Sequence, residues 1–248
     1  MIKIMIDPGH GGNDRSNKGP TGYVEADGML ELSKKLRDEL VSTGAFNVKL
    51  TRESDVSIGV RARGEMAVKW GADMLISQHS NATGGAIPSS ARGVEVYYSV
   101  DIPTDKSLAM KLSKAISEVM QNKDRGAKTW ESTTYPGEDY LGVIDAAQDG
   151  GVPHVFLIES GFHDNLEDEA LLKNPDIITL IAKAQAKVIC EFYGVSYPQN
   201  QSEEEVSEWA KSSWQKAIKK GVNDGLGAKN SVTEEQLMVF FDRLGLLD

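Results

Sequence analysis

The 248-residue chain switches repeatedly between the hydrophobic spacing of strands and that of helices. Short apolar runs predict strands at residues 2–6, 47–52, 74–77, 93–100 and 154–159. Apolar positions three and four residues apart predict helices at residues 28–42, 56–70, 108–120 and 175–193. Because helices between strands act as crossover connections, we expect an α/β fold with a mostly parallel, twisted sheet flanked by helices.

The pattern changes after the last of these helices. Residues 194–204 are polar and contain proline, which is typical of a linker between a domain at residues 1–193 and a tail at residues 205–248. The tail predicts a small α-helical C-terminal module. Because about 45 residues is marginal for an independent domain, we expect it to pack on the first domain, to self-associate, or to bind a ligand.

Composition excludes several classes of function. The chain has 27 Lys and Arg against 37 Asp and Glu, a net charge of −10, which argues against nucleic-acid binding and against docking on an anionic membrane. No window approaches the 18 apolar residues of a membrane span. The N-terminus reaches Asp7 too early for a signal peptide, so we expect synthesis in the cytoplasm. Cys190 is the single cysteine, so a metal site would need the four histidines and carboxylates.

Two of these histidines directly follow predicted strands. His10 lies in the turn Asp7-Pro8-Gly9-His10-Gly11-Gly12, and His79 lies in Ser77-Gln78-His79-Ser80. Parallel strands end at one edge of the sheet, where open sheets place their sites, so we expect the two imidazoles to converge. A phosphate-binding glycine loop is an alternative for the first turn, but its GxGxxG spacing and its lysine are absent. Either histidine alone would suggest an incidental turn residue.

A tetrahedral catalytic zinc site needs a third protein ligand, and a carboxylate is a usual complement to two histidines. Asp14, Glu25 and Asp27 are the candidates in the segment after His10. Glu25 is placed best, at the start of the helix after the first strand. Spacing leaves open whether Glu25 is a ligand or an acid favoured by the helix dipole.

Glu159 ends the apolar run of residues 155–158 and is expected at the same edge of the sheet. Partial burial there would raise the pKa of its carboxyl, which suits a general base near neutral pH. The alternative is a helix cap or a salt-bridge partner. Together, two histidines and two carboxylates form a set that suits metal-assisted hydrolysis.

The ordered motifs of residues 1–193 resemble the zinc-dependent N-acetylmuramoyl-L-alanine amidases of the type-3 amidase family. Besides the two histidine turns, the resemblance rests on Glu25, Thr51-Arg52-Glu53-Ser54-Asp55, Gly93-Val94-Glu95-Val96-Tyr97-Tyr98, Asp124-Arg125-Gly126 and Glu159-Ser160-Gly161-Phe162-His163-Asp164-Asn165. It implies His10, Glu25 and His79 as Zn²⁺ ligands and Glu159 as the catalytic base. The implied reaction cleaves the amide between the lactyl group of N-acetylmuramic acid and the L-alanine of the stem peptide, with a zinc-activated water.

Small departures from that family leave these four positions intact. Gln78 and Ser160 stand where apolar residues are usual, and His154 opens the last strand as an expected structural histidine. Asn81 and His163 are candidates for contacts with substrate. For His163 a solvated loop position is the alternative.

The tail resembles small modules that follow such amidases in phage lysins of Gram-positive hosts. Trp209 and Trp214 are its candidates for wall binding, or they form the core of a helical hairpin. We therefore expect a peptidoglycan hydrolase, an endolysin released through a phage holin or a bacterial autolysin, that acts on a Gram-positive cell wall. The alternatives are a zinc peptidase that cuts within the stem peptide and a wall-binding protein on an inactive amidase scaffold.

Overall fold

The computed structural model describes residues 1–85 and 87–198. Residues Met1–Tyr197 form one compact unit of the chain. The predicted module at residues 205–248, with Trp209 and Trp214, and most of the predicted linker lie outside the described residues.

The described unit is built on one sheet with the strand order β2-β1-β3-β6-β4-β5. The strands are β1 (Ile2–Pro8), β2 (Phe46–Leu50), β3 (Met74–Asn81), β4 (Val94–Tyr98), β5 (Asp124–Lys128) and β6 (His154–Phe162). β2, β1, β3 and β6 run parallel, whereas β4 pairs antiparallel with β6 and parallel with β5. β4 is reversed because it follows β3 through a connection without a helix. The prediction of a mostly parallel sheet is confirmed.

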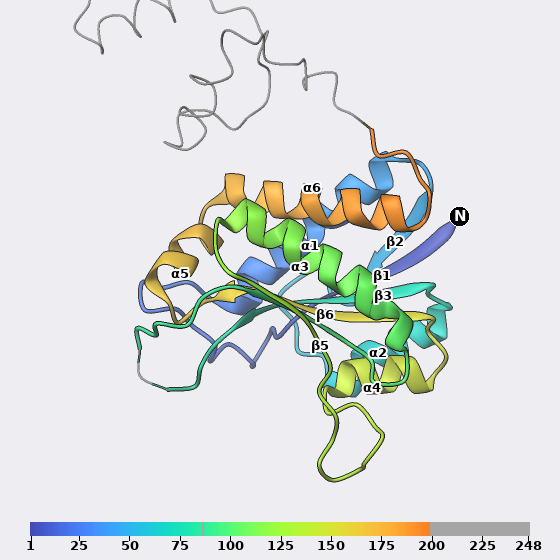
Figure 1. Cartoon of the computed structure of the whole chain (residues 1–248), viewed down its shortest axis with the longest axis horizontal. Coiled ribbons are helices and arrows are strands. Elements are labelled where there is room, and N and C mark those ends of the chain that lie inside the picture. Colours follow the sequence, from blue (N-terminus) through green and yellow to red (C-terminus); the bar gives the residue numbers. More distant parts are fainter. Residues whose placement is uncertain (86, 199–248) are drawn as a thin grey trace, which may run out of the picture. The chain divides into compact units, whose positions relative to one another are not determined.

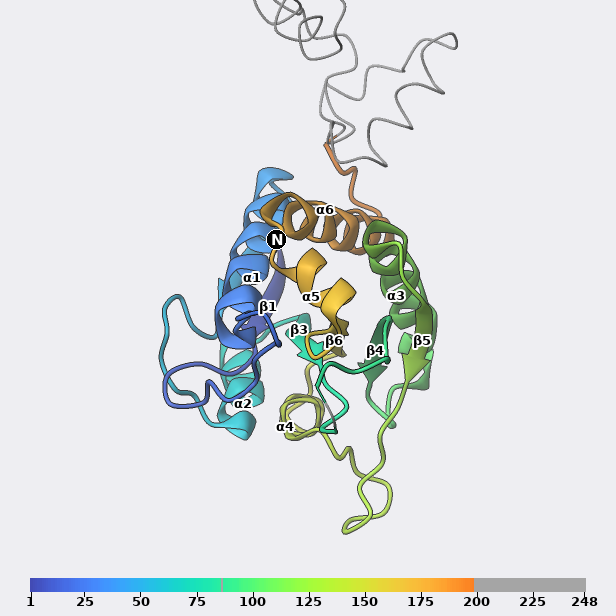
Figure 2. The same ribbon diagram turned by 90° about the vertical axis from the view of Figure 1, so that its left-hand side faces the viewer.

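Helices cover both faces of this sheet (Figure 1). They are α1 (Glu25–Ser42), α2 (Val60–Trp70), α3 (Lys106–Met120), α4 (Gly142–Asp149), α5 (Leu166–Leu172) and α6 (Pro175–Phe192), with a 3₁₀ turn, η1 (Pro103–Asp105). α1, α3 and α6 lie on one face, and α2 and α4 lie on the other (Figures 1 and 2). The predicted α/β class is therefore confirmed.

The apolar runs of the strands are buried on both faces, as expected for a sheet between two helical layers. Ile4, Ile6 and Ile76 belong to the larger core under α1, α3 and α6. Met5 and Leu75, which alternate with them, belong to the smaller core under α2 and α4. Side chains at odd positions of β1 and β3 therefore point toward the α2 and α4 face.

Several elements differ from the sequence prediction. The helix expected at residues 28–42 begins at Glu25, and the helix expected at residues 56–70 begins at Val60. β3 continues past the expected residue 77 to Asn81, which places His79 within the strand. β5, α4 and α5 were not predicted, because β5 is a polar edge strand and both helices are short.

The residues that follow α6, up to Tyr197, still pack against this unit. The amide N–H of Val195 donates to the carbonyl of Cys190 at 2.8 Å, and Val195 and Tyr197 pack against the larger core. The Tyr197 hydroxyl donates a hydrogen bond to Glu39 on α1. Among residues 1–85 and 87–198, no helix combines the length and the apolar character needed to cross a membrane.

Candidate active site

Three neighbouring strands bring the predicted residues to one edge of the sheet. β1 and β3 pair in register from Ile4 and Met74 onward, so the turn carrying His10 lies beside the end of β3. His79 pairs directly with Glu159 across β3 and β6. His10 adopts a left-handed backbone with φ of 58°, which turns the chain back over the sheet. Gly9 is required here because a Cβ atom would lie 2.4 Å from the ring of His79.

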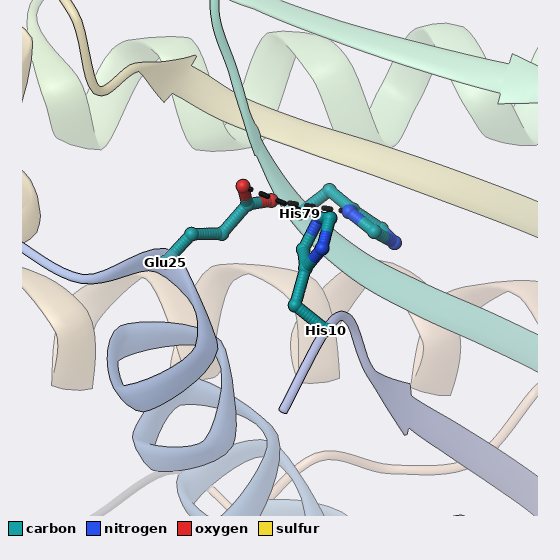
Figure 3. A group of neighbouring side chains, drawn as sticks. All are labelled: His10, Glu25 and His79. Carbon is teal, nitrogen blue, oxygen red and sulfur yellow. Dashed lines mark hydrogen bonds and ion pairs between the residues drawn. The ribbon is translucent and has the colours of Figure 1, made fainter. Parts of the chain in front are cut away.

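His10, Glu25 and His79 form one cluster (Figure 3). Oε2 of Glu25 lies 3.3 Å from Nε2 of His10, and Oε1 lies 3.1 Å from Nδ1 of His79. One donor atom from each residue falls within 4.8 Å of the others, so the three could hold one metal ion. Glu25 is 1% exposed as the first residue of α1.

The three candidate carboxylates separate clearly in the structure. Asp14 lies outside the cluster, with Oδ2 at 2.7 Å from Nδ1 of His10. Asp27 accepts hydrogen bonds from the guanidinium of Arg15 at 2.9 and 2.5 Å. Glu25 alone of the three reaches both histidines. Asp14 instead occupies the place of the carboxylate that commonly orients a metal-binding histidine from behind.

The electrostatics of the cluster favour a cation. Burial alone would lower the pKa of His10, but the hydrogen bonds and charges of Glu25 and Asp14 outweigh it and raise this pKa to about 9. Burial alone would raise the pKa of Glu25, but its contacts with His10 and His79 hold this pKa well below its usual range. A buried carboxylate that stays ionised between two imidazoles is a suitable environment for a divalent metal ion.

Two buried arginines hold the turn that carries His10. Arg52 donates to the carbonyls of Pro8 at 2.9 Å and Gly9 at 2.8 Å, and also to Ala26 on α1 at 2.7 Å. Arg63 donates to the carbonyl of His10 at 2.8 Å. The role of Arg52 was not predicted although its motif was noted, and Arg63 was not predicted as a site residue. The sequence signal for Arg52 was its place just after the second strand, where a side chain can reach the turn that follows the first strand.

Glu159 faces the cluster as a half-buried carboxylate. Its Oε2 is buried and accepts no hydrogen bond from the described residues. The pKa of Glu159 is raised well above its ordinary value, first by burial and then by the negative charges of Glu25 and Glu95. This is the direction expected from the position of Glu159 at the end of an apolar strand. No capping bond or salt bridge to Glu159 occurs within residues 1–85 and 87–198, so that alternative finds no support there.

A charged network that sequence analysis missed lies on the other side of Glu159. Glu95 pairs with Glu159 across β4 and β6 and is buried. It accepts hydrogen bonds from Nε of Arg125 at 2.6 Å, from the ammonium of Lys128, and from the hydroxyl of Tyr97 at 2.9 Å. Nδ2 of Asn81 also donates to Glu95 at 2.9 Å, so Asn81 connects this network to β3.

The remaining two histidines lie in different surroundings: Nδ1 of His163 lies 3.8 Å from Oε2 of Glu25 in the cluster, whereas His154 lies away from it. His163 is 3% exposed, and its Nδ1 lies 2.9 Å from the carbonyl of Ser80, so the solvated loop position expected as an alternative is wrong. It follows β6 directly, so its main chain stays with the sheet and its side chain lies inward. His154 contacts Asp105 at 2.8 Å at the opposite end of β6, in agreement with the expected structural position.

A cavity of about 160 Å³ opens beside the cluster. His10 and His79 form one part of its lining. Residues at the start of α4, together with Leu157 in the middle of β6, form another part. The lining residues include Ile58, Val60, Leu141, Gly142, Val143 and Leu157. The cavity gives the cluster an apolar wall and an opening for a ligand.

Comparison with known proteins agrees with this geometry. Residues 4–191 match the N-acetylmuramoyl-L-alanine amidase family described as Amidase_3. The chain is 31% identical to the N-acetylmuramoyl-L-alanine amidase CwlM of Bacillus licheniformis, over 79% of this chain and 70% of that protein. It is also 31% identical to the endolysin of Bacillus phage SPP1, over 76% of this chain and 65% of that protein.

A solved structure shows the same fold. The crystal structure of an N-acetylmuramoyl-L-alanine amidase from Clostridium difficile 630 superposes with a TM-score of 0.68 and 27% identity, covering 78% of this chain and 97% of that one. The family match includes all six strands except the first two residues of β1, and every residue of the cluster. The chain therefore belongs to the type-3 N-acetylmuramoyl-L-alanine amidase family.

Proposed function

We propose that this chain is a zinc-dependent peptidoglycan amidase that cleaves the amide between the lactyl group of N-acetylmuramic acid and the L-alanine of the stem peptide. The observation that carries this proposal is the cluster of His10, Glu25 and His79 beside the unpartnered carboxylate of Glu159. Family membership supports the choice of this amide over other amides. Acidic composition supports the absence of nucleic-acid partners.

The donor set fits Zn²⁺. Two imidazole nitrogens and one carboxylate oxygen are the ligands of many catalytic zinc sites, which leave a fourth position open. We assign His10, through Nε2, His79, through Nδ1, and Glu25 to this role. When bound there, Zn²⁺ supplies a Lewis acid that polarises a carbonyl group and lowers the pKa of water.

Glu159 supplies the proton transfers in this mechanism. Its carboxylate accepts a proton from the water whose oxygen attacks the lactyl carbonyl carbon. It then donates that proton to the nitrogen of L-alanine as the carbon–nitrogen bond breaks. A raised pKa suits both roles, because the group can hold the proton between the two transfers near neutral pH.

Substitution of Glu159 and of His79 separates these roles. We expect Glu159→Gln to retain Zn²⁺ and to lose amidase activity by roughly 10²- to 10⁴-fold, as measured by metal content and by mass spectrometry of digested walls. We expect His79→Ala to lose Zn²⁺. Wild-type activity in the Glu159→Gln variant would contradict the mechanism, and a new carboxyl group within the stem peptide would instead indicate a peptidase.

We further propose that the protein degrades the wall of a Gram-positive bacterium as an endolysin or autolysin. Similarity to the SPP1 phage endolysin supports this role. Release through a phage holin, and wall binding by Trp209 and Trp214 in the tail, remain parts of this proposal. Digestion of purified walls from several species would identify the host.

A further inference from the structure

The edge of the sheet formed by β4 and β5, next to Glu159 on β6, is not covered by the helices on the α2 and α4 face. α2 and α4 lie under the central strands, and β4 and β5 extend past them (Figure 2). Tyr97 on β4 is half-buried and pairs with Leu157 on β6, two residues before Glu159. At the rise of a strand, Tyr97 therefore lies ~7 Å along the sheet from the position of Glu159.

Two further aromatic side chains extend this side of the site. The rings of Trp130 and Tyr140 stack with centroids 4.3 Å apart and planes at 20°. The ring of Trp130 also lies 6.1 Å from that of Tyr97. Trp130 is 46% exposed and Tyr140 is 54% exposed. We call Tyr97, Trp130 and Tyr140 the aromatic row.

The backbone holds the aromatic row in place. The amide of Tyr140 donates to the carbonyl of Trp130 at 2.7 Å, and the amide of Ser132 donates to the carbonyl of Glu138 at 2.8 Å. These bonds pair the two arms of the loop between β5 and α4. Since exposed aromatic rings gain little from the core, a pair fixed in this way indicates a binding surface.

The aromatic row continues from the cavity of the active site. Leu141 and Leu157 line that cavity together with His10 and His79. Tyr140 immediately precedes Leu141, and Tyr97 is the cross-strand partner of Leu157. A ligand that leaves the cavity on this side would pass over the row.

Charge restricts the ligand to a neutral one. The loop at residues 129–141 carries Glu131, Glu138 and Asp139 and has no lysine or arginine. Arg125 and Lys128 on the neighbouring strand β5 are both paired with Glu95, and Arg61 on α2 is paired with Asp145. An anionic wall polymer or a peptide carboxylate would therefore be disfavoured. The sugar rings of the glycan strand are uncharged as long as the lactyl carboxyl group of N-acetylmuramic acid is held in the amide to the stem peptide. These pyranose rings present flat C–H faces to an aromatic ring and hydroxyl groups to surrounding acceptors.

We propose that the aromatic row is a subsite for sugar rings of the glycan strand on which the scissile amide is carried. This inference rests on the proposed amidase function, since that amide is attached directly to a sugar. The glycan would extend from Glu159 across β4 and toward the 129–141 loop. The row would then favour polymeric glycan over an isolated muramoyl-peptide.

The test uses the full chain and neutral oligomers of β-1,4-linked N-acetylglucosamine as the probe, with binding measured by calorimetry. We expect the native chain to bind, and the Trp130→Ala, Tyr140→Ala double variant to bind roughly tenfold more weakly. Trp130→Phe, which keeps a ring, should retain most of the affinity. With peptide-bearing glycan strands as substrate, the double variant should raise KM more than kcat falls.

Tyr135→Ala is the matched control, because Tyr135 lies in the same loop, is 69% exposed and takes part in no ring stack within the described residues. Its binding should equal that of the native chain. An equal loss in Tyr135→Ala, native affinity in the double variant, or no binding by the native chain would overturn the proposal. Cleavage of an isolated muramoyl-peptide tests the amidase function separately, because that substrate has no glycan strand.

Discussion

Asp14 acts on the candidate metal cluster from outside, through its 2.7 Å contact with Nδ1 of His10. Because this contact fixes the ring with Nε2 on the side of Glu25, we expect Asp14→Ala to weaken Zn²⁺ binding by ~10- to 100-fold in a chelator competition. Asp27→Ala is the matched control, since Asp27 pairs with Arg15. Equal losses of Zn²⁺ affinity in both variants would show that Asp14 acts through its negative charge alone and does not orient His10.

Glu95 raises the pKa of Glu159 through its negative charge, after the larger effect of burial. Glu95→Gln removes that charge and leaves Arg125 and Lys128 without their partner. Both changes favour ionised Glu159 and so lower its pKa. Because the base must be ionised, activity is lost as pH falls through this pKa, and we expect the acid limb of kcat/KM to move to lower pH.

A charge-matched substitution outside the Glu95 network controls this experiment. Glu65 is an exposed residue of α2. Glu65→Gln should leave the pH profile in place. An acid limb that stays fixed in Glu95→Gln, or moves equally in both variants, would show that Glu95 does not act on Glu159.

For individual residues, the sequence predicted the location of those that follow or end apolar strands, but it did not predict their hydrogen-bond partners. His10, His79 and Glu159 were expected at one edge because each follows or ends an apolar run. The contact of Asp14 with His10 was not expected, since spacing favoured Glu25 among the three carboxylates and gave Asp14 no partner. The pairing of Glu95 with Arg125 joins segments 30 residues apart, and local patterns carry no information about such contacts.

Between elements, β3 and α6 share a buried polar pair. Gln78 and Gln185 exchange hydrogen bonds of 2.6 and 3.2 Å, and both are fully buried. This pairing explains how Gln78 occupies a position where an apolar residue was expected. We expect Gln78→Leu alone to lower the free energy of unfolding by about 1–3 kcal/mol, because Gln185 would remain buried without a partner.

The double variant Gln78→Leu, Gln185→Leu removes both polar groups. It should recover much of the stability lost in the single variant, because no unsatisfied group remains. Urea unfolding of the two single variants and the double variant would measure this coupling. Strictly additive losses would show that the two glutamines contribute independently.

The elements themselves could be predicted where the pattern was long and apolar. α1, α3 and α6 bury wide apolar faces, and their positions agree with the predicted helices within a few residues. β5 could not be predicted, because its sequence Asp-Arg-Gly-Ala-Lys has no alternation and lies at the edge of the sheet. Its hydrogen-bonded pairing with β4 stabilises the extended conformation, although the β-propensity of its residues is low.

Across the whole molecule, net charge limits how the protein can approach a cell wall. The chain carries −10, and residues 201–248 contain six Lys and Arg against nine Asp and Glu. Gram-positive walls are themselves polyanionic, so bulk attraction would not concentrate the protein there. We therefore expect wall binding to depend on specific contacts and to weaken little when salt is raised from low to physiological concentration, as measured by co-sedimentation with purified walls.

The boundary of the catalytic unit gives the last prediction. Val195 and Tyr197 pack against the core, so a chain that ends at Tyr197 keeps contacts that a chain ending at Tyr193 loses. We expect residues 1–197 to fold, to bind Zn²⁺ and to cleave a muramoyl-peptide at the rate of the full chain. Residues 1–193 should be less stable by about 1–3 kcal/mol in urea unfolding.

The same fragment tests the tail. If residues 198–248 bind the wall, residues 1–197 should co-sediment less with walls and lyse them more slowly, while turnover of the isolated muramoyl-peptide is unchanged. Since the short substrate presents no wall surface, it separates a targeting effect from damage to the active site. Full wall binding and full lysis by residues 1–197 would exclude a targeting role for the tail and assign wall recognition to the catalytic unit.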